Sequence, residues 1–117
     1  MIQCLYVFVG GGLGSLMRYG ISCLFIKYNF PLATLLANTT SCLILALFLI
    51  FVQKFNFNND IRFFMVIGFC GGLSTFSTFS YETINLIKEG YINYAILNIG
   101  FSIILCFCIL NLLVRRL

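Results

Sequence analysis

Four long apolar runs alternate with short polar connections along the chain. About 20 consecutive apolar residues cross a bilayer as an α-helix, so each run is long enough for one membrane span. Pro31 opens the second run, where its missing N–H is no loss, and Gly90 follows the third run as a typical helix stop. The pattern predicts that residues 1–117 form a single four-helix transmembrane domain. Its expected spans are about 2–26, 32–52, 61–88 and 92–114.

The composition supports a membrane protein and argues against other classes. Of 117 residues, 62% are hydrophobic and 9% are charged, whereas a soluble domain carries about 25% charged residues. The net charge of +4 comes from scattered lysines and arginines, so no basic patch is available to bind nucleic acid. Histidine is absent, and the only acids are Asp60, Glu82 and Glu89. Without a histidine or a paired acid dyad, we expect no enzyme activity.

The third run is too long for one straight span. About 28 helical residues would extend about 42 Å, against a hydrocarbon core of about 30 Å. Its middle, residues 68–82, reads GFCGGLSTFSTFSYE, with two adjacent glycines followed by interleaved hydroxyls and phenylalanines. We therefore expect an all-α membrane protein whose third helix is broken at its centre. Broken helices at membrane depth line wet cavities or lie buried in protein. A continuous helix, with its Ser and Thr bonded to their own turns, is the alternative.

Polar side chains inside the spans are candidate functional residues. Arg18 and Glu82 are ionisable, and intramembrane ionisable residues commonly mark functional sites. The alternative is that they pair as structural ions or reach out to the interface. Asn38 has no helix end to cap, so its amide either faces an aqueous path or bonds a neighbouring helix. Gly10 and Gly14 form a G-x-x-x-G spacing, which predicts close packing against another helix.

Phe76 and Phe79 share one helical face between flanking hydroxyls. The edge of an aromatic ring is electropositive. Ring edges together with hydroxyl and amide donors would suit a small anion. No T-V-G-Y-G segment is present, which argues against a potassium channel.

The charges give little preference for one membrane orientation. With four spans, both termini lie on one side, together with four basic residues, against two or three on the other side. A clear Lys/Arg excess is what normally fixes orientation. So small a bias permits insertion both ways and hence an antiparallel dimer; a single orientation with cytoplasmic termini is the alternative. The four basic residues are Lys54, Arg62, Arg115 and Arg116, and the others are Lys27, Lys88 and, when it is counted, Arg18.

Three segments resemble one known family. Residues 68–82 closely resemble the signature of the Fluc/CrcB fluoride channels, approximately G-x-x-G-G-[LF]-[ST]-T-F-S-T-F-S-x-E. Residues 10–19, GGGLGSLMRY, are similar to the glycine stretch of that family, which ends in Arg-Tyr. Residues 34–38, TLLAN, resemble its second-span element T-L-x-V-N. The third-span motif is the specific one, and the other two support it.

The resemblance implies a fluoride-selective channel that exports fluoride passively across the cell inner (plasma) membrane. It implies an antiparallel, dual-topology homodimer embedded in membrane lipid, with two pores and a central structural Na⁺. The carbonyls of Gly71 and Ser74 would hold this Na⁺, and Arg18 and Glu82 would lie at a vestibule and along a polar track. The residues implied for the fluoride path are Phe76, Phe79, Asn38, Ser77, Thr78, Ser80 and Ser102.

One departure from the family and two other functions remain to be weighed. The fourth span of the family commonly shows Tyr-x-x-x-Ser, whereas this chain has Asn98 and Ser102. A small multidrug-resistance-type proton antiporter is the alternative transporter, and it needs a membrane-embedded acid. Glu82 is the only candidate for that acid, and it lies near the end of its span. A structural subunit would leave the run of hydroxyls and phenylalanines without a role.

Overall fold

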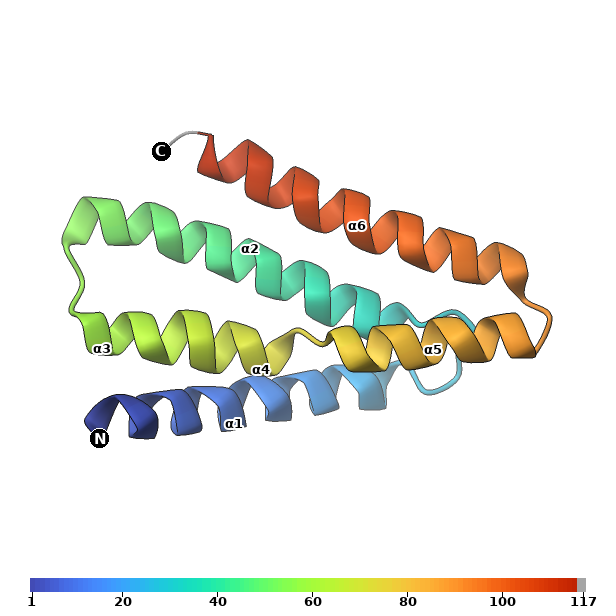
Figure 1. The fold of residues 1–117 in the computed structure, drawn as a ribbon, viewed down its shortest axis with the longest axis horizontal. Helices are drawn as coiled ribbons and strands as arrows, with labels where there is room; N and C mark the ends of the chain where they lie inside the picture. The colour runs from blue at the N-terminus through green and yellow to red at the C-terminus, as the bar shows by residue number, and fades with distance from the viewer. Residues whose placement is uncertain (116–117) are drawn as a thin grey trace.

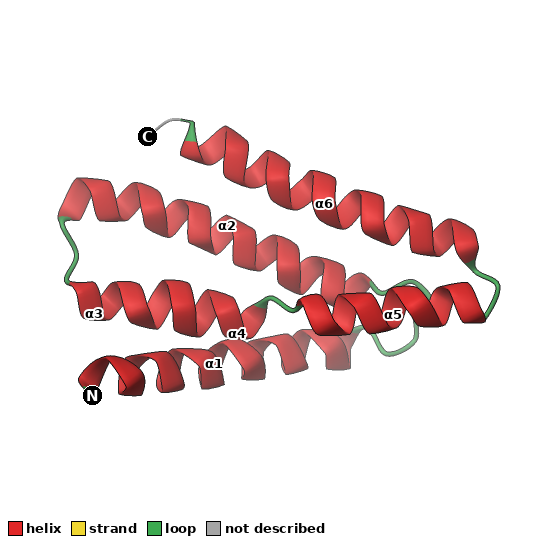
Figure 2. Ribbon diagram, viewed as in Figure 1, coloured by secondary structure: helices red, strands yellow, loops and turns green. Residues whose placement is uncertain are grey.

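The computed structural model describes residues 1–115 (Figures 1 and 2). Arg116, which entered the charge count above, and Leu117 lie outside the described residues. Within residues 1–115 all regular secondary structure is helical, joined by short loops, and no strand is present. The elements are α1 (Ile2–Leu24), α2 (Leu32–Phe55), α3 (Asn59–Arg62), the π-helical segment η1 (Phe63–Cys70), α4 (Gly71–Leu73), α5 (Phe76–Lys88) and α6 (Ile92–Val114).

Four helical stretches are long and apolar enough to cross a membrane. Three are the single helices α1, α2 and α6, and the fourth is the composite stretch Asn59–Lys88. The second helix continues through Phe55, beyond the predicted end at residue 52, and stops at Asn56 in the left-handed conformation (φ 46°). With four such stretches, the chain is a multi-pass membrane protein. The start of α1 and the end of α6 lie at the same end of the molecule (Figure 1).

The third stretch is broken, as the sequence predicts. After α4 the backbone of Ser74 (φ −76°, ψ 154°) and Thr75 (φ −152°, ψ 120°) is extended, and α5 begins at Phe76. Figure 1 shows this interruption between α4 and α5. The alternative of a continuous helix is therefore wrong. The two glycines that suggested the break are themselves helical, because α4 begins at Gly71.

Glycines allow α1 to lie directly against η1 and α4. A Cβ on Gly14 would sit 2.8 Å from the backbone N of Leu73 and would also meet the carbonyl of Phe69. A Cβ on Gly72 would meet the carbonyl of Gly11. The two backbones touch because neither side carries a side chain, which is the usual geometry of small-residue helix pairs in membranes. The close packing predicted from Gly10 and Gly14 is confirmed.

The remaining helices enclose a small core and leave a large apolar exterior. α6 packs along α2 and also contacts α5, and the most deeply buried side chains include Ala46, Leu73 and Asn98. Many large apolar side chains are exposed; Phe8, for example, has 78% of its surface uncovered. An apolar exterior of this extent suits lipid rather than water.

Candidate functional site

The side chain of Asn38 holds the break in the third stretch. Its Oδ1 accepts from the backbone N of Thr75 at 2.7 Å, and its Nδ2 donates to the backbone O of Thr75 at 3.2 Å. An amide side chain carries a donor and an acceptor on two separate atoms, so it can bond an N–H and a C=O at once. Asn38 therefore replaces, across helices, the hydrogen bond that the Thr75 N–H would make to Gly71 inside a continuous helix. It also donates to the Thr75 carbonyl, which as the N-cap carbonyl accepts the first bond of α5 as well.

Thr75 also caps the new helix. Its Oγ1 accepts from the backbone N of Thr78 at 3.2 Å and donates to Thr78 Oγ1 at 3.1 Å. Thr is a favoured residue at this position because its oxygen satisfies an otherwise free N–H in the first helical turn. The positive end of the α5 dipole thus points towards the break.

The same contacts release two backbone carbonyls. In a regular helix the carbonyl of Gly71 would accept from Thr75 N, and that of Ser74 from Thr78 N. Thr75 N instead bonds Asn38, and Thr78 N bonds the Thr75 hydroxyl. Both carbonyls are therefore left without their usual helical partner at the break.

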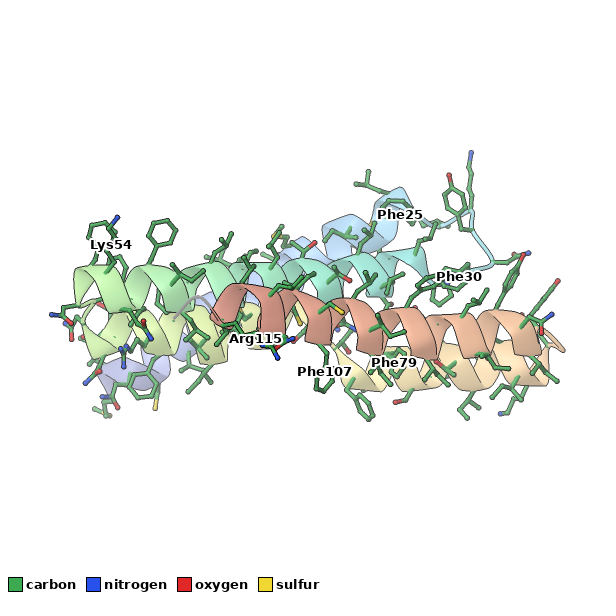
Figure 3. The ribbon with its side chains drawn as sticks, turned by 90° about the horizontal axis from the view of Figure 1, so that it is seen from above. Phe25, Phe30, Lys54, Phe79, Phe107 and Arg115 are labelled. Atoms are coloured by element: carbon green, nitrogen blue, oxygen red, sulfur yellow. The ribbon has the colours of Figure 1, made fainter. Side chains whose placement is uncertain are left out.

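A cavity of about 340 Å³, here called the Phe cavity, opens beside the break. The rings of Phe76 and Phe79 lie in one wall with centroids 5.8 Å apart and planes tilted by 38°. Figure 3 shows Phe79 near Phe107 of α6, which lines the same cavity. Phe76 is 79% exposed, so most of its side-chain surface is uncovered in a single protomer. The lining residues are Asn38, Cys42, Ser74, Thr75, Phe76, Phe79, Ser102, Ile103, Cys106 and Phe107.

A second cavity of about 250 Å³, here called the charged cavity, lies on the other side of Thr75. It holds the guanidinium of Arg18 and the carboxyl of Glu82, yet within residues 1–115 the two form no ion pair within 4.0 Å. Arg18 Nε and Glu82 Oε2 are both buried without a hydrogen-bond partner. The lining residues are Ser15, Arg18, Tyr19, Ser22, Ala33, Thr34, Thr75, Thr78 and Glu82.

A hydrogen-bond chain links α6 to the Phe cavity. Asn98 Nδ2 donates to Thr83 Oγ1 at 2.9 Å, and Thr83 Oγ1 donates to the backbone O of Phe79 at 2.7 Å. Because the only proton of Thr83 goes to Phe79, the Asn98 amide must present its NH₂ to Thr83. Asn98 Oδ1 and Ser102 Oγ are then left buried without partners, one turn apart on α6.

Comparisons with known proteins identify the family. The model of the CrcB-like protein family, Camphor Resistance (CrcB), matches residues 5–113. The chain is 47% identical over 97 residues to a fluoride-specific ion channel FluC of Pyrococcus abyssi, covering 81% of this chain and 79% of the relative. It is 40% identical over 110 residues to FluC of Coxiella burnetii (strain CbuK_Q154), covering 90% and 89%. FluC of Phocaeicola vulgatus is 40% identical over 93 residues, covering 77% of each chain.

The chain belongs to the CrcB family. The curated CrcB relatives above are named as ion channels, so this is a family of channels and not of enzymes.

In this CrcB protein the predicted site residues divide between the two cavities. The Phe cavity brings together Asn38, Ser74, Phe76, Phe79 and Ser102. The charged cavity brings together Arg18, Thr78 and Glu82.

Two predicted hydroxyls line neither of these cavities. Ser77 is exposed, and its Oγ lies 3.3 Å from Thr75 Oγ1, within hydrogen-bond distance. Ser80 is half-buried on α5. Gly71 also lines neither cavity. The atom that concerns its predicted role is its backbone carbonyl oxygen, which lacks its usual helical partner.

Sequence reasoning missed Thr75 and the thiols of the Phe cavity. A signal for Thr75 existed, because a threonine directly before a helical run is a typical N-cap. No local signal marks Cys42 and Cys106, because their place in the cavity wall depends on how α2 and α6 are rotated against each other.

Proposed function

We propose that this protein is a fluoride-selective channel that lets fluoride leave the cell passively across the cell inner (plasma) membrane. The observation that carries the proposal is the Phe cavity, placed against a break that Asn38 holds open. The names of the relatives, fluoride-specific ion channels, support the choice of ion.

The chemistry of the Phe cavity suits a small dehydrated anion. Removing water from an ion is costly unless other groups replace its hydrogen bonds. Asn38 Nδ2 has a second N–H beyond the one given to Thr75, and Ser102 Oγ is an unpartnered hydroxyl in the same wall. The electropositive ring edges of Phe76 and Phe79 and the N-terminus of α5 add favourable fields. We expect fluoride to pass between these groups, while the larger chloride ion fits less well.

The polar groups further along α5 continue the proposed path. Thr75 lines both cavities, so an ion leaving the Phe cavity next meets Thr78 and the charged cavity. Arg18 there offers a positive charge without an ion-pair partner, and Glu82 lines the same space. We assign Arg18 to a vestibule, and Glu82, Ser77, Thr78 and Ser80 to a polar track.

We further propose an antiparallel, dual-topology homodimer with two pores. In one protomer Phe76 is largely exposed, so its proposed path has only one wall until a second copy supplies the other. The weak charge bias across the four spans permits both orientations that such a dimer needs. Each protomer then contributes one fluoride path, so the dimer has two pores related by its two-fold axis.

The released carbonyls fit a structural Na⁺ at the centre of this dimer. Gly71 and Ser74 each present a backbone oxygen without its helical partner, and hard cations prefer oxygen ligands. Two copies around a two-fold axis would provide four such oxygens. When bound, the ion supplies positive charge that offsets anion charge at membrane depth. Asn38 and Thr75 are the residues that keep these two carbonyls free.

Anion efflux from liposomes tests the function. The purified chain is reconstituted into vesicles loaded with potassium fluoride or potassium chloride, and release is followed after addition of a potassium ionophore. We expect fast fluoride release and negligible chloride release. Fluoride retention by vesicles that contain well-folded protein would overturn the proposal.

A further inference from the structure

Two cysteines lie in the wall of the Phe cavity. Cys42 on α2 and Cys106 on α6 both line it, and the two side chains lie near enough to influence each other electrostatically. Both are half-buried, whereas Cys4, Cys23 and Cys108 are exposed.

The helix register explains why the two thiols meet. Cys42 follows Asn38 by four residues, and Cys106 follows Ser102 by four, so each thiol lies one turn beyond a polar residue of the cavity. α2 and α6 pack together and run in the same direction in Figure 1. Four residues advance a helix by about 6 Å, so moving from Asn38 to Cys42 and from Ser102 to Cys106 shifts the position along the cavity by the same amount in the same direction. The thiol pair lies one turn away from the Asn38 contact with Thr75.

We propose that Cys42 and Cys106 form a binding site for a soft, two-coordinate metal cation, and that an ion bound there stops anion passage through the Phe cavity. The second half of this inference rests on the proposed function, and the first half does not.

The donor set favours this class of cation. Soft cations such as Hg²⁺ prefer sulfur ligands. Within residues 1–115 no group of three or more Cys, Asp or Glu is arranged to hold a metal, so a four-coordinate ion such as Zn²⁺ would lack ligands. When Hg²⁺ binds, two S–H bonds break, two S–Hg bonds form and two protons go to water. The Hg²⁺ complex carries no net charge, so the apolar wall formed by Ile103 and Phe107 tolerates it.

Mercury binding and fluoride efflux together test the proposal. The reference protein carries Cys4→Ser, Cys23→Ser and Cys108→Ser, which removes the exposed thiols. Stoichiometry of bound Hg²⁺ is measured in detergent by mass spectrometry, and efflux is measured in liposomes with HgCl₂ or ZnCl₂ added. We expect one Hg²⁺ per protomer, fluoride efflux reduced to the leak of protein-free vesicles, recovery with excess dithiothreitol, and no effect of Zn²⁺.

Single substitutions locate the site. Cys42→Ala and Cys106→Ala are each introduced into the reference protein. Each variant is expected to bind no stoichiometric Hg²⁺. Its fluoride efflux after HgCl₂ should equal the efflux of the same variant without HgCl₂. The matched control is a protein that lacks Cys42 and Cys106 but has Cys108 restored. Its fluoride efflux should be insensitive to HgCl₂.

The outcomes separate this site from the proposed function. Absence of fluoride efflux before any metal is added contradicts the channel, while Hg²⁺ binding still tests the thiol pair. One Hg²⁺ bound with unchanged efflux overturns the block. Binding that survives Cys42→Ala and Cys106→Ala overturns the site.

Discussion

The side chain of Asn38 forms two hydrogen bonds with the backbone of Thr75, one to its N–H and one to its C=O. Thirty-seven residues separate the two in sequence. The contact fixes where the third stretch breaks, frees the carbonyl of Gly71 and places Phe76 at the start of a helix. Thr75 itself lines both cavities, and Asn38 lines the Phe cavity.

Removing the Asn38 amide should destabilise the protein and end fluoride efflux. Asn38→Ala leaves the N–H of Thr75 unsatisfied and removes one donor from its C=O, and an unsatisfied group costs about 1–3 kcal/mol when buried. Thermal unfolding in detergent and liposome efflux measure the two effects. Thr39→Ala is the matched control, because Thr39 Oγ1 bonds only the carbonyl of Leu35 in its own helix. Equal stability of the two variants would contradict this role of Asn38.

The two phenylalanines should be required for efflux and not for folding. Phe76→Ile and Phe79→Ile keep apolar bulk but remove the ring edge, so we expect fluoride release to fall to the background leak with the dimer intact. Phe101→Ile, on α6 and outside the lining of both cavities, serves as control. Size-exclusion chromatography follows the dimer. Normal fluoride flux in either cavity variant would remove the role assigned to that ring.

Glycines of α1 should differ sharply in their tolerance of a methyl group. Gly14→Ala places a Cβ against the backbone of Phe69 and Leu73, and overpacking of this kind costs about 1–3 kcal/mol. Gly12→Ala meets nothing within 4 Å and should be neutral or stabilising by up to about 1 kcal/mol through helix propensity. Parallel thermal melts in detergent compare the pair. Similar melting temperatures for both variants would argue against direct contact between α1 and α4.

The contact between Asn98 and Thr83 should respond asymmetrically to mutation. Thr83→Val leaves the buried Nδ2 of Asn98 without an acceptor, at a cost of about 1–3 kcal/mol. Asn98→Leu leaves Thr83 with its bond to Phe79 and also removes the unpartnered Oδ1, so its cost should be smaller. Denaturant titration in micelles measures the difference. A larger loss for Asn98→Leu than for Thr83→Val would contradict this assignment of the hydrogen bonds.

The class of protein and its main elements follow from the sequence. Apolar runs of span length and few charges predict four membrane helices, because both are local properties that a bilayer selects directly. The excess length of the third run predicts that it breaks. The spacing of Gly10 and Gly14 predicts a close helix contact, since small residues at that spacing remove side chains from one face.

The tertiary structure decided where the break lies and which side chains share a cavity. Gly71 and Gly72 suggested the break, yet both stay helical, and Gly72 meets the backbone of Gly11. The chain opens instead at Ser74 and Thr75, because the partner that satisfies the Thr75 N–H is a side chain on α2. The division of hydroxyls between the cavities and the meeting of Cys42 with Cys106 depend on the rotation and depth of packed helices. Those are relations between distant segments, and no local pattern in the sequence encodes them.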